Sequence, residues 1–519
     1  MPATLTYPGV YIEEIPSGVH TITGVATSIT AFVGRAWKGR LDEPVIITSY
    51  ADYERQFGGL WRGSTLSYAV RQFFLNGGSQ AIIIRVATRT GVNTAVAATI
   101  NAGGGNTFIA SSEGTWGRNL KVTIDHDTKD TTDAKLFNLT VFDDPALPPA
   151  LPRDAEGRGG SGVREKFLNV SVDDTSPRYI ETVLEQQSIL LRTQAVGNAA
   201  PVPAANLQSA ANAGNDGVDI TGPVIEGNVQ NKTGLNALLK TDLFNLLCIP
   251  PLTIGASGTD VPISTWTAAA TLCETRRAFL VVDAPNNWTI ANAQTNVTDF
   301  SAIVRKNAAI YFPRLVITDS LLDGNSDEFA SCGVIAGLMS RTDSARGVWK
   351  APAGTEANLR GVLGLTLNMT DPENGLLNPL GINCLRTFPG IGTLCWGART
   401  LEGQDILASE WKYVPIRRLA LFLEESLFRG TKWVVFEPND EPLWAKIRLN
   451  VGAFMMSLFR QGAFQGSTPD KAFYVKCDGE TTTQDDRNKG IVNIEVGFAP
   501  LKPAEFVVIK IQQMAGDLA

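Results

Sequence analysis

The chain has 519 residues, with 45 Lys and Arg against 52 Asp and Glu, and a formal net charge of −7 at pH 7. Binding to phosphates needs a concentration of basic residues, so this charge balance argues against a protein that wraps nucleic acid. The length allows about two to four domains, and the composition, 44% hydrophobic and 19% charged, is that of a globular protein.

The sequence contains no stretch of about 18 uninterrupted apolar residues, and its first residues, MPATLT, lack the regions of a secretory signal. We therefore expect a soluble chain made in the cytoplasm, with no direct membrane insertion. The six cysteines are widely scattered and form no C-x-x-C pair. This pattern predicts buried, reduced thiols rather than a zinc or redox site.

The N-terminal region begins with an extended, β-type run at Tyr7–Ile15, stiffened by Pro8 and ended by the turn residues of Pro16–Gly18. An unpaired apolar strand exposes backbone groups with which another chain can pair. The run therefore predicts an arm, residues 1–23, that joins a neighbouring subunit by strand exchange. The residues expected to pair are Tyr7, Val10, Tyr11, Ile12 and Ile15.

Residues 24–90 and 218–350 are predicted to form one α/β domain, because short apolar runs alternate with helical patterns. A largely parallel sheet is expected. The predicted strands are 29–33, 44–47, 81–86, 243–249, 279–282 and 308–312, and the predicted helices are 50–57, 64–75, 264–277, 291–306 and 327–340.

Residues 91–217 differ in composition, being rich in Gly, Thr, Asn and Asp, and this predicts a β-rich insertion into the α/β domain. Its expected strands are 106–110, 120–125, 136–142 and 167–172. The stretch 195–217, rich in Ala, Asn, Pro and Gly, is predicted to be a linker back to the α/β domain.

Residues 351–519 are predicted to form a C-terminal α+β domain. Two amphipathic helices are expected at 416–429 and 441–461, the second with Asn439 or Asp440 as its N-cap and Pro442 in its first turn. Their apolar faces are expected to face a core.

The C-terminal region ends in a second strand-like run, 491–498, in which Ile494, Val496 and Phe498 share one face, and a further apolar run at 506–511 contains Phe506 and Val508. Strand-like runs at both ends favour exchange of strands between subunits. The predicted fold class is therefore α/β (α+β) and multidomain, with a C-terminal domain completed by exchanged N- and C-terminal strands.

Catalytic and metal-binding motifs are lacking. The chain has two histidines, His20 and His126, and neither a phosphate-binding loop nor an H-E-x-x-H motif. The acidic residues around His126 are expected to form a solvated turn. Those in 319–328 depart from the calcium-loop spacing and predict an acidic helix N-terminus. We expect no enzyme activity and no cofactor.

Several sequence blocks together resemble the contractile tail sheath proteins of bacteriophages, tailocins and phage-like contractile injection systems. They lie at both ends of the chain, and the β-rich insertion carries no likeness. The blocks are Tyr7–Glu14, Gly24–Gly34, Asp52–Gly59, Phe73–Gly78, Trp396–Leu401, Tyr413–Leu419, Gly430–Asp440 and Pro503–Phe506.

The resemblance implies a helical stack of hexameric rings around an inner tube, assembled in an extended, metastable state and shortened when a baseplate triggers it. It implies as partners other sheath copies, the inner tube protein, and baseplate and tail-terminator or cap proteins. Contraction would then need no ATP, and rigid domains would rotate while exchanged strands keep the rings linked. Pro16, Gly18 and Gly24 are the expected bending points of the arm.

In such sheaths the C-terminal domain faces the tube, which implies tube contacts along one of the two predicted C-terminal helices and an outermost position for the β-rich insertion. The candidate contacts are Arg417, Arg418, Lys446 and Arg448. Assembly is expected in the bacterial cytoplasm, followed by incorporation into a virion or a phage tail-like particle that lysis can release. The alternatives are a static self-assembling shell protein and an acidic soluble α/β enzyme.

Overall fold

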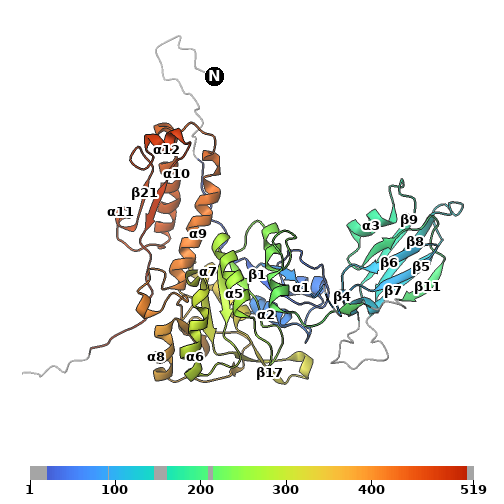
Figure 1. Ribbon diagram of the computed structural model, residues 1–519, viewed down its shortest axis with the longest axis horizontal. Helices are drawn as coiled ribbons and strands as arrows, with labels where there is room; N and C mark the ends of the chain where they lie inside the picture. Colours follow the sequence, from blue (N-terminus) through green and yellow to red (C-terminus); the bar gives the residue numbers. More distant parts are fainter. Residues whose placement is uncertain (1–19, 90, 92, 145–159, 209–213, 511–519) are drawn as a thin grey trace, which may run out of the picture. The chain divides into compact units, whose positions relative to one another are not determined.

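The computed structural model describes residues 20–89, 91, 93–144, 160–208 and 214–510 (Figure 1). The described residues separate into two compact units. One lies within Thr27–Arg417, and the other combines residues 20–26 with the chain from Arg418 onward. The predicted arm residues 1–19 lie outside the described part.

The larger unit is built on an eight-stranded sheet in the order β2-β3-β1-β13-β14-β15-β19-β20. The six central strands are parallel, and the two at the edges are antiparallel. In chain order the strands are β1 (Thr30–Gly34), β2 (Val45–Ile47), β3 (Ala81–Arg85), β13 (Leu246–Cys248), β14 (Phe279–Asp283), β15 (Ala308–Phe312), β19 (Ile382–Phe388) and β20 (Gly392–Cys395).

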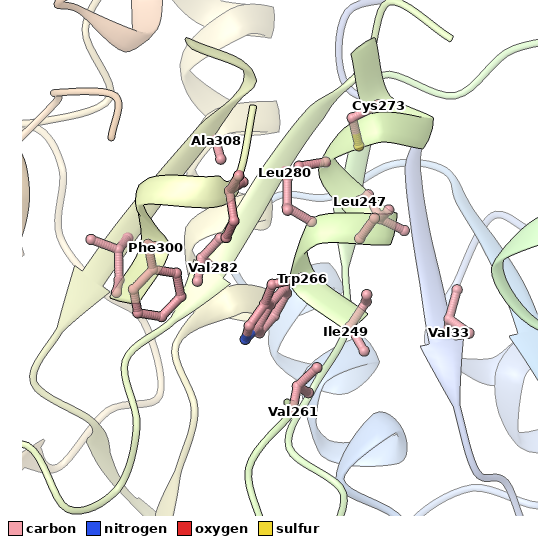
Figure 2. Close-up of a cluster of buried hydrophobic side chains, with 14 of the residues drawn as sticks. Val33, Leu247, Ile249, Val261, Trp266, Cys273, Leu280, Val282, Phe300 and Ala308 are labelled. Carbon is pink, nitrogen blue, oxygen red and sulfur yellow. The ribbon is translucent and has the colours of Figure 1, made fainter. Parts of the chain in front are cut away.

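Both faces of this sheet are covered by helices, which explains why its strands are continuous apolar runs. On one face, Val33 and Leu247 belong to a buried cluster that includes Trp266 and Cys273 of α5 (Ile263–Thr275), shown in Figure 2. On the other face, Phe32 meets Phe73 edge to face, with ring centroids 5.5 Å apart.

Phe73 lies in α2 (Thr65–Leu75), which Ser64 caps by accepting the Ser67 N–H. α2 follows α1 (Tyr50–Phe57), capped in the same way by Ser49. α2 packs against α7 (Cys332–Arg346). The remaining elements of the α/β part are α4 (Gly222–Glu226), α6 (Ile290–Asn296), β16 (Leu315–Thr318), β17 (Ser326–Phe329), β18 (Gly364–Leu365) and α8 (Asp371–Leu377).

The β-rich insertion carries its own sheets, of order β10-β6-β5 and β11-β7-β8-β9, around a separate buried cluster that includes Trp116 and Phe137. It enters and leaves the α/β part through the antiparallel pair β4 and β12. Its elements are β4 (Ala95–Val96), β5 (Thr99–Gly103), β6 (Asn106–Ala110), β7 (Leu120–Asp125), β8 (Leu136–Asp143), β9 (Arg164–Ser171), α3 (Ile180–Gln187), β10 (Leu191–Ala195), β11 (Ala204–Gln208) and β12 (Asn215–Asp216).

Buried polar contacts join the insertion to the α/β part. The Arg85 side chain is 1% exposed and donates hydrogen bonds to the backbone carbonyls of Ala36 (2.9 Å) and Glu113 (2.8 Å). Lys38 lies 4.0 Å from the Asp143 carboxylate, with both side chains buried. The insertion is therefore attached by more than its two connecting strands.

The smaller unit contains two long helices and a two-stranded sheet. Helix α9 (Val414–Gly430) begins in the larger unit and runs into the smaller one, and α10 (Glu441–Arg460) starts at Asp440, which caps it. The sheet pairs β21 (Phe473–Lys476) with β22 (Glu495–Phe498) in antiparallel register. Short helices α11 (Pro469–Ala472) and α12 (Gln484–Asn488) complete the unit.

The predicted α/β (α+β), multidomain fold class is confirmed, and its completion by exchanged strands stays a prediction. Several boundaries differ from those predicted. The α/β part does not end at residue 350, because β19 and β20 complete the main sheet and the compact units divide after Arg417. The predicted helix 291–306 ends at Asn296 and continues as 3-10 turns. The predicted linker 195–217 contains strands β11 and β12.

Candidate functional site

The carboxyl edge of the parallel sheet is where enzymes of this architecture bind ligands, at the point where the strand order reverses. Here that point lies between β1 and β13. Nearby, the buried Asp283 accepts hydrogen bonds from the backbone N–H groups of Ser331 (2.9 Å) and Cys332 (2.8 Å) at the start of α7. The protein's own carboxylate therefore occupies the position where a helix N-terminus would hold an anion.

Burial raises the pKa of Asp283, although the two backbone donors and the Arg314 guanidinium act in the opposite direction. The cavity beside this edge, lined by Tyr68, Gln72 and Arg314 among others, measures about 20 Å³. That volume is on the order of one water molecule. This cavity therefore has no space for a substrate.

The acidic stretch 319–328 lies on the hairpin of β16 and β17, so the predicted acidic helix N-terminus is wrong. The buried Asp319 accepts from the Tyr68 hydroxyl (2.9 Å) and pairs with Arg62, which also pairs with Asp327 at 2.9 Å. These carboxylates serve as counter-ions that attach the hairpin to the residues before α2.

The second predicted polar turn surrounds His126, whose Nε2 lies 2.7 Å from the Pro201 carbonyl oxygen. Among the residues that the structure describes, no three His, Cys, Asp or Glu side chains are arranged to hold a metal ion. In the same part of the chain, no helix is long and apolar enough to cross a membrane.

The predicted C-terminal strand exists as β22, and its partner β21 belongs to the same chain. Val496 lies opposite Val475, and Phe498 lies opposite Phe473. Phe464 packs on both phenyl rings, with centroids 6.1 Å from Phe473 and 6.0 Å from Phe498. Ile494 comes directly before the strand and is half-buried. The strand-exchange residues Tyr7, Val10, Tyr11, Ile12 and Ile15, with the hinge residues Pro16 and Gly18, lie outside the described residues.

After β22 the chain continues without regular structure into four consecutive apolar residues that are largely exposed. Phe506 is 75% exposed, Val507 81%, and Val508 and Ile509 79% each. A soluble protein rarely leaves such a run uncovered unless another surface covers it. We call residues 506–509 the apolar tail.

Two of the four candidate tube contacts are buried. Arg417 is 5% exposed, and its Nε donates to the Asn307 side chain at 3.0 Å while its guanidinium lies over the Trp411 ring. Arg418 is 4% exposed. Both side chains are therefore buried in the single chain, not on an exposed helix face.

The other two candidates lie on α10. Arg448 is half-buried and pairs with Glu441 (2.5 Å) and with the Cys477 carbonyl. Lys446 is exposed and shares an outward helix face with Ala445, Ala453 and Leu449, the last 59% exposed. Sequence reasoning missed Leu449, although the position follows from the 3.6-residue period once the buried face is known.

A second exposed apolar feature lies between α9 and α10. Phe436 is fully exposed, at 102% of its reference area, and has a positive φ of 71°, while its neighbour Val435 is 64% exposed. A non-glycine residue held in the left-handed region is strained, and such strain gathers at functional positions. No local sequence pattern marks Phe436 beforehand.

Comparison with known families matches residues 227–401 to the phage tail sheath protein central domain and residues 408–514 to the phage tail sheath C-terminal domain. Together the two matches cover more than half of the chain. A tail sheath protein of Vibrio phage KVP40 is 28% identical over 189 residues, which is 36% of this chain and 26% of that protein.

Solved structures extend the similarity to nearly the whole chain. The sheath of the extracellular contractile injection system PVC, in its contracted state, is 22% identical with a TM-score of 0.58 and covers 99% of both chains. The contracted helical sheath of the anti-feeding prophage is also 22% identical, with a TM-score of 0.57, over 98% of this chain and 100% of that one. At this identity the likeness concerns the fold.

Proposed function

Because this chain belongs to the phage tail sheath protein family, we propose that it is the structural subunit of a contractile sheath. Copies of the chain polymerise as stacked hexameric rings around an inner tube. The assembled sheath is metastable when extended, and its contraction drives the tube through a target membrane. The further partners are baseplate and tail-terminator or cap proteins.

The observation that carries this proposal is that one chain contains both a small sheet, with edges unpaired in the described residues, and an exposed apolar tail. β21 and β22 form a sheet of two strands, each four residues long. Two-stranded sheets are marginally stable alone and gain stability from further strands. The apolar tail follows β22 after a few residues and is largely exposed. A tail from a second copy that adds to the sheet would cover both.

Exchange of strands between copies suits a sheath because it links subunits through backbone hydrogen bonds that do not depend on one orientation of the domains. Each bond contributes only about 0.5–1.5 kcal/mol net. Several bonds at every junction can nevertheless hold rings together while the domains rotate as rigid bodies. We propose that the arm, with Tyr7, Val10, Tyr11, Ile12 and Ile15, supplies a further strand in the same way.

Free energy for contraction is proposed to reside in the packing between subunits rather than in a bound nucleotide. The start of α7, where a helix could hold a phosphate, supports this, since the Asp283 carboxylate already accepts its backbone N–H groups. The soluble enzyme alternative would need a substrate site, and the cavity of about 20 Å³ lined by Tyr68, Gln72 and Arg314 is too small for one.

The outward face of α10 is the proposed contact with the inner tube. Lys446 supplies a positive charge on this face, and Leu449 supplies exposed apolar area. Arg448 can contribute only if it leaves Glu441. The β-rich insertion is proposed to lie outermost, and assembly is proposed to take place in the bacterial cytoplasm before release of the virion or particle by lysis.

The test is electron microscopy of the purified chain, alone and co-expressed with a candidate tube protein. We expect hollow, ribbed cylinders of one diameter. Two lattices that differ in helical rise, before and after mild denaturant, would establish contraction. A single unchanging lattice would favour the static shell, and monodisperse particles in both samples would refute a sheath.

A further inference from the structure

Residues 20–26, which we call the anchor segment, carry the chain from the arm towards the main sheet. The segment has no regular secondary structure, yet it contacts both long helices of its unit. Its contacts involve Phe422, Ser426 and Gly430 of α9, Trp433 after α9, and Asn450 of α10.

The apolar contacts interlock, with a glycine on each side. A β-carbon added to Gly430 would come within 2.6 Å of Ile22 Cγ2, and one added to Gly24 would come within 2.8 Å of Phe422 Cζ. Such distances leave no room for a larger residue, so the Ile22 side chain packs on the backbone of Gly430 and the Phe422 ring on that of Gly24. Ile22 is only 6% exposed as a result. Gly24, a predicted hinge, thus has a packing role here.

The polar contacts attach the backbone of the segment to buried side chains. The His20 N–H donates to Asn450 Oδ1 at 3.2 Å, and the Val25 N–H donates to Ser426 Oγ at 3.2 Å. Asn450 is 3% exposed and Ser426 is 0% exposed. At the N-terminal end, the His20 ring stacks on Trp433, with ring centroids 4.2 Å apart and planes 18° apart.

These contacts follow α9 in the reverse direction, from Ser426 beside Val25 to Trp433 beside His20. Tension applied to the chain before His20 therefore acts first on the His20–Trp433 stack and the His20–Asn450 hydrogen bond, and only then on residues 27–29. The force is delivered to the helix pair and not to the strand β1 that follows.

We propose that the anchor segment makes the N-terminal arm able to carry tension between sheath subunits, by fastening the arm to α9 and α10. This inference rests on the proposed sheath function. It separates two roles: arm residues pair with a neighbour, whereas residues 20–26 hold the arm to its own subunit while the sheath contracts.

The experiment compares the full-length wild-type chain with Gly430→Ala, Trp433→Ala and a control, Val435→Ala. Gly430 is the last residue of α9, so alanine there favours the helix while its β-carbon displaces Ile22. Trp433→Ala removes the stack with His20. Val435 is 64% exposed in the same connection.

Hydrogen exchange of the unassembled chain is the first readout. We expect the His20 and Val25 amides to exchange about tenfold faster in the Gly430→Ala variant, since a tenfold change corresponds to about 1.4 kcal/mol. Trp433→Ala should accelerate His20 similarly, while exchange within α10 and in Val435→Ala stays unchanged. If the His20 and Val25 amides exchange at the wild-type rate in both test variants, the proposed attachment of the anchor segment is wrong.

Electron microscopy of assembled tubes is the second readout. Both test variants keep the arm sequence, so they should form extended tubes of wild-type length that break into short pieces when mild denaturant sets off contraction. If variants with faster exchange in the anchor segment still give intact contracted tubes, the proposal that this segment carries tension is wrong. Absence of tubes from the wild type would instead refute the sheath itself, whatever the exchange result.

Discussion

Gly333 of α7 lies so close to Ala69 of α2 that a β-carbon added to it would stand 2.1 Å from the Ala69 carbonyl oxygen. One turn further, a β-carbon on Gly337 would stand 2.5 Å from the Phe73 carbonyl oxygen. The two helices therefore pack backbone to backbone across two successive turns, on the face of the main sheet that Phe32 lines.

Gly333→Ala should lower the stability of the larger unit by about 1–3 kcal/mol, because the added methyl group has no space between the helices. Thermal unfolding followed by circular dichroism measures this. Gly375→Ala is the matched control, since Gly375 lies in α8 with nothing within 4 Å of its added β-carbon. The control should be neutral or stabilising, and an equal loss in both variants would contradict the packing argument.

Arg85→Met should loosen the β-rich insertion. The change leaves buried carbonyls of Ala36 and Glu113 without their donor, and each unpaired buried group costs about 1–3 kcal/mol. We expect faster protease cleavage within the insertion and a lower melting temperature. Arg40→Met breaks an exposed ion pair to Glu185 at the same junction and should change stability by less than about 1 kcal/mol.

Asp283→Asn tests the buried carboxylate at the start of α7. Burial raises the folded-state pKa of Asp283 above its unfolded value. The stability it contributes is therefore fully present below the unfolded pKa and is lost as the pH rises through the folded pKa. The asparagine variant should lack this loss, so its stability relative to the wild type should improve between pH 4 and pH 7.

Denaturation at several pH values measures the Asp283 effect. Asp319→Asn is the comparison, because Asp319 is paired with Arg62 and Tyr68 and its replacement removes a counter-ion. We expect that variant to be less stable than the wild type throughout the range. A constant difference between Asp283→Asn and the wild type from pH 4 to pH 7 would disprove the titration.

The six cysteines should be unreactive in the native chain. All are buried, and burial raises the pKa of the Cys384 and Cys395 thiols to about 12 and that of Cys477 to about 11. A thiol reagent at neutral pH should label fewer than one thiol per chain natively and all six in denaturant. Cys477 alone lies in the smaller unit, so its labelling rate reports opening of that unit separately.

Phe506→Asp with Val508→Asp should abolish sheath assembly and leave the subunit folded, because both side chains are largely exposed in the single chain. Sedimentation and electron microscopy give the assembly state, and circular dichroism gives the fold. Lys502→Asp, at an exposed position before the tail, should still assemble. Wild-type tubes from the double aspartate variant would exclude strand addition by the tail.

Removal of residues 1–17 should give a folded subunit that forms no long sheaths, since the predicted pairing residues are deleted while the anchor segment remains. Size-exclusion chromatography and electron microscopy distinguish the outcomes. Normal-length tubes from this truncation would show that the arm is dispensable for assembly.

Short sequence patterns predicted the helices and strands that depend mainly on neighbouring residues. The sequence predicted α1, α2, β6 and β7 within a residue or two, and the alternating run 491–498 predicted β22. The acids of 319–328 were misread because the partner that explains Asp319 is Arg62, 257 positions away. No window of sequence contains both residues.

The same distinction between local patterns and contacts distant in the sequence applies to the candidate site residues. Phe506 and Val508, predicted from the apolar run 506–511 to pair with another subunit, are largely exposed, and the exchange itself stays a prediction. Arg417 looked like a surface charge on an amphipathic helix, but Asn307 and Trp411 bury it through contacts that depend on the fold. The β21 partner of β22 was missed because its four residues carry little pattern.

The entry and exit of the β-rich insertion are adjacent, since Ala95 pairs with Asp216 and Val96 with Asn215. Paired strands hold the two chain ends about 5 Å apart. At its covalent connection, the insertion therefore takes up no more of the α/β part than a short hairpin would, and Arg85 and Lys38 add further contacts. Evolution could exchange this module between lineages, and an engineer could graft a compact domain with neighbouring termini there to decorate the particle, provided that the graft offers Arg85 a carbonyl in place of Glu113.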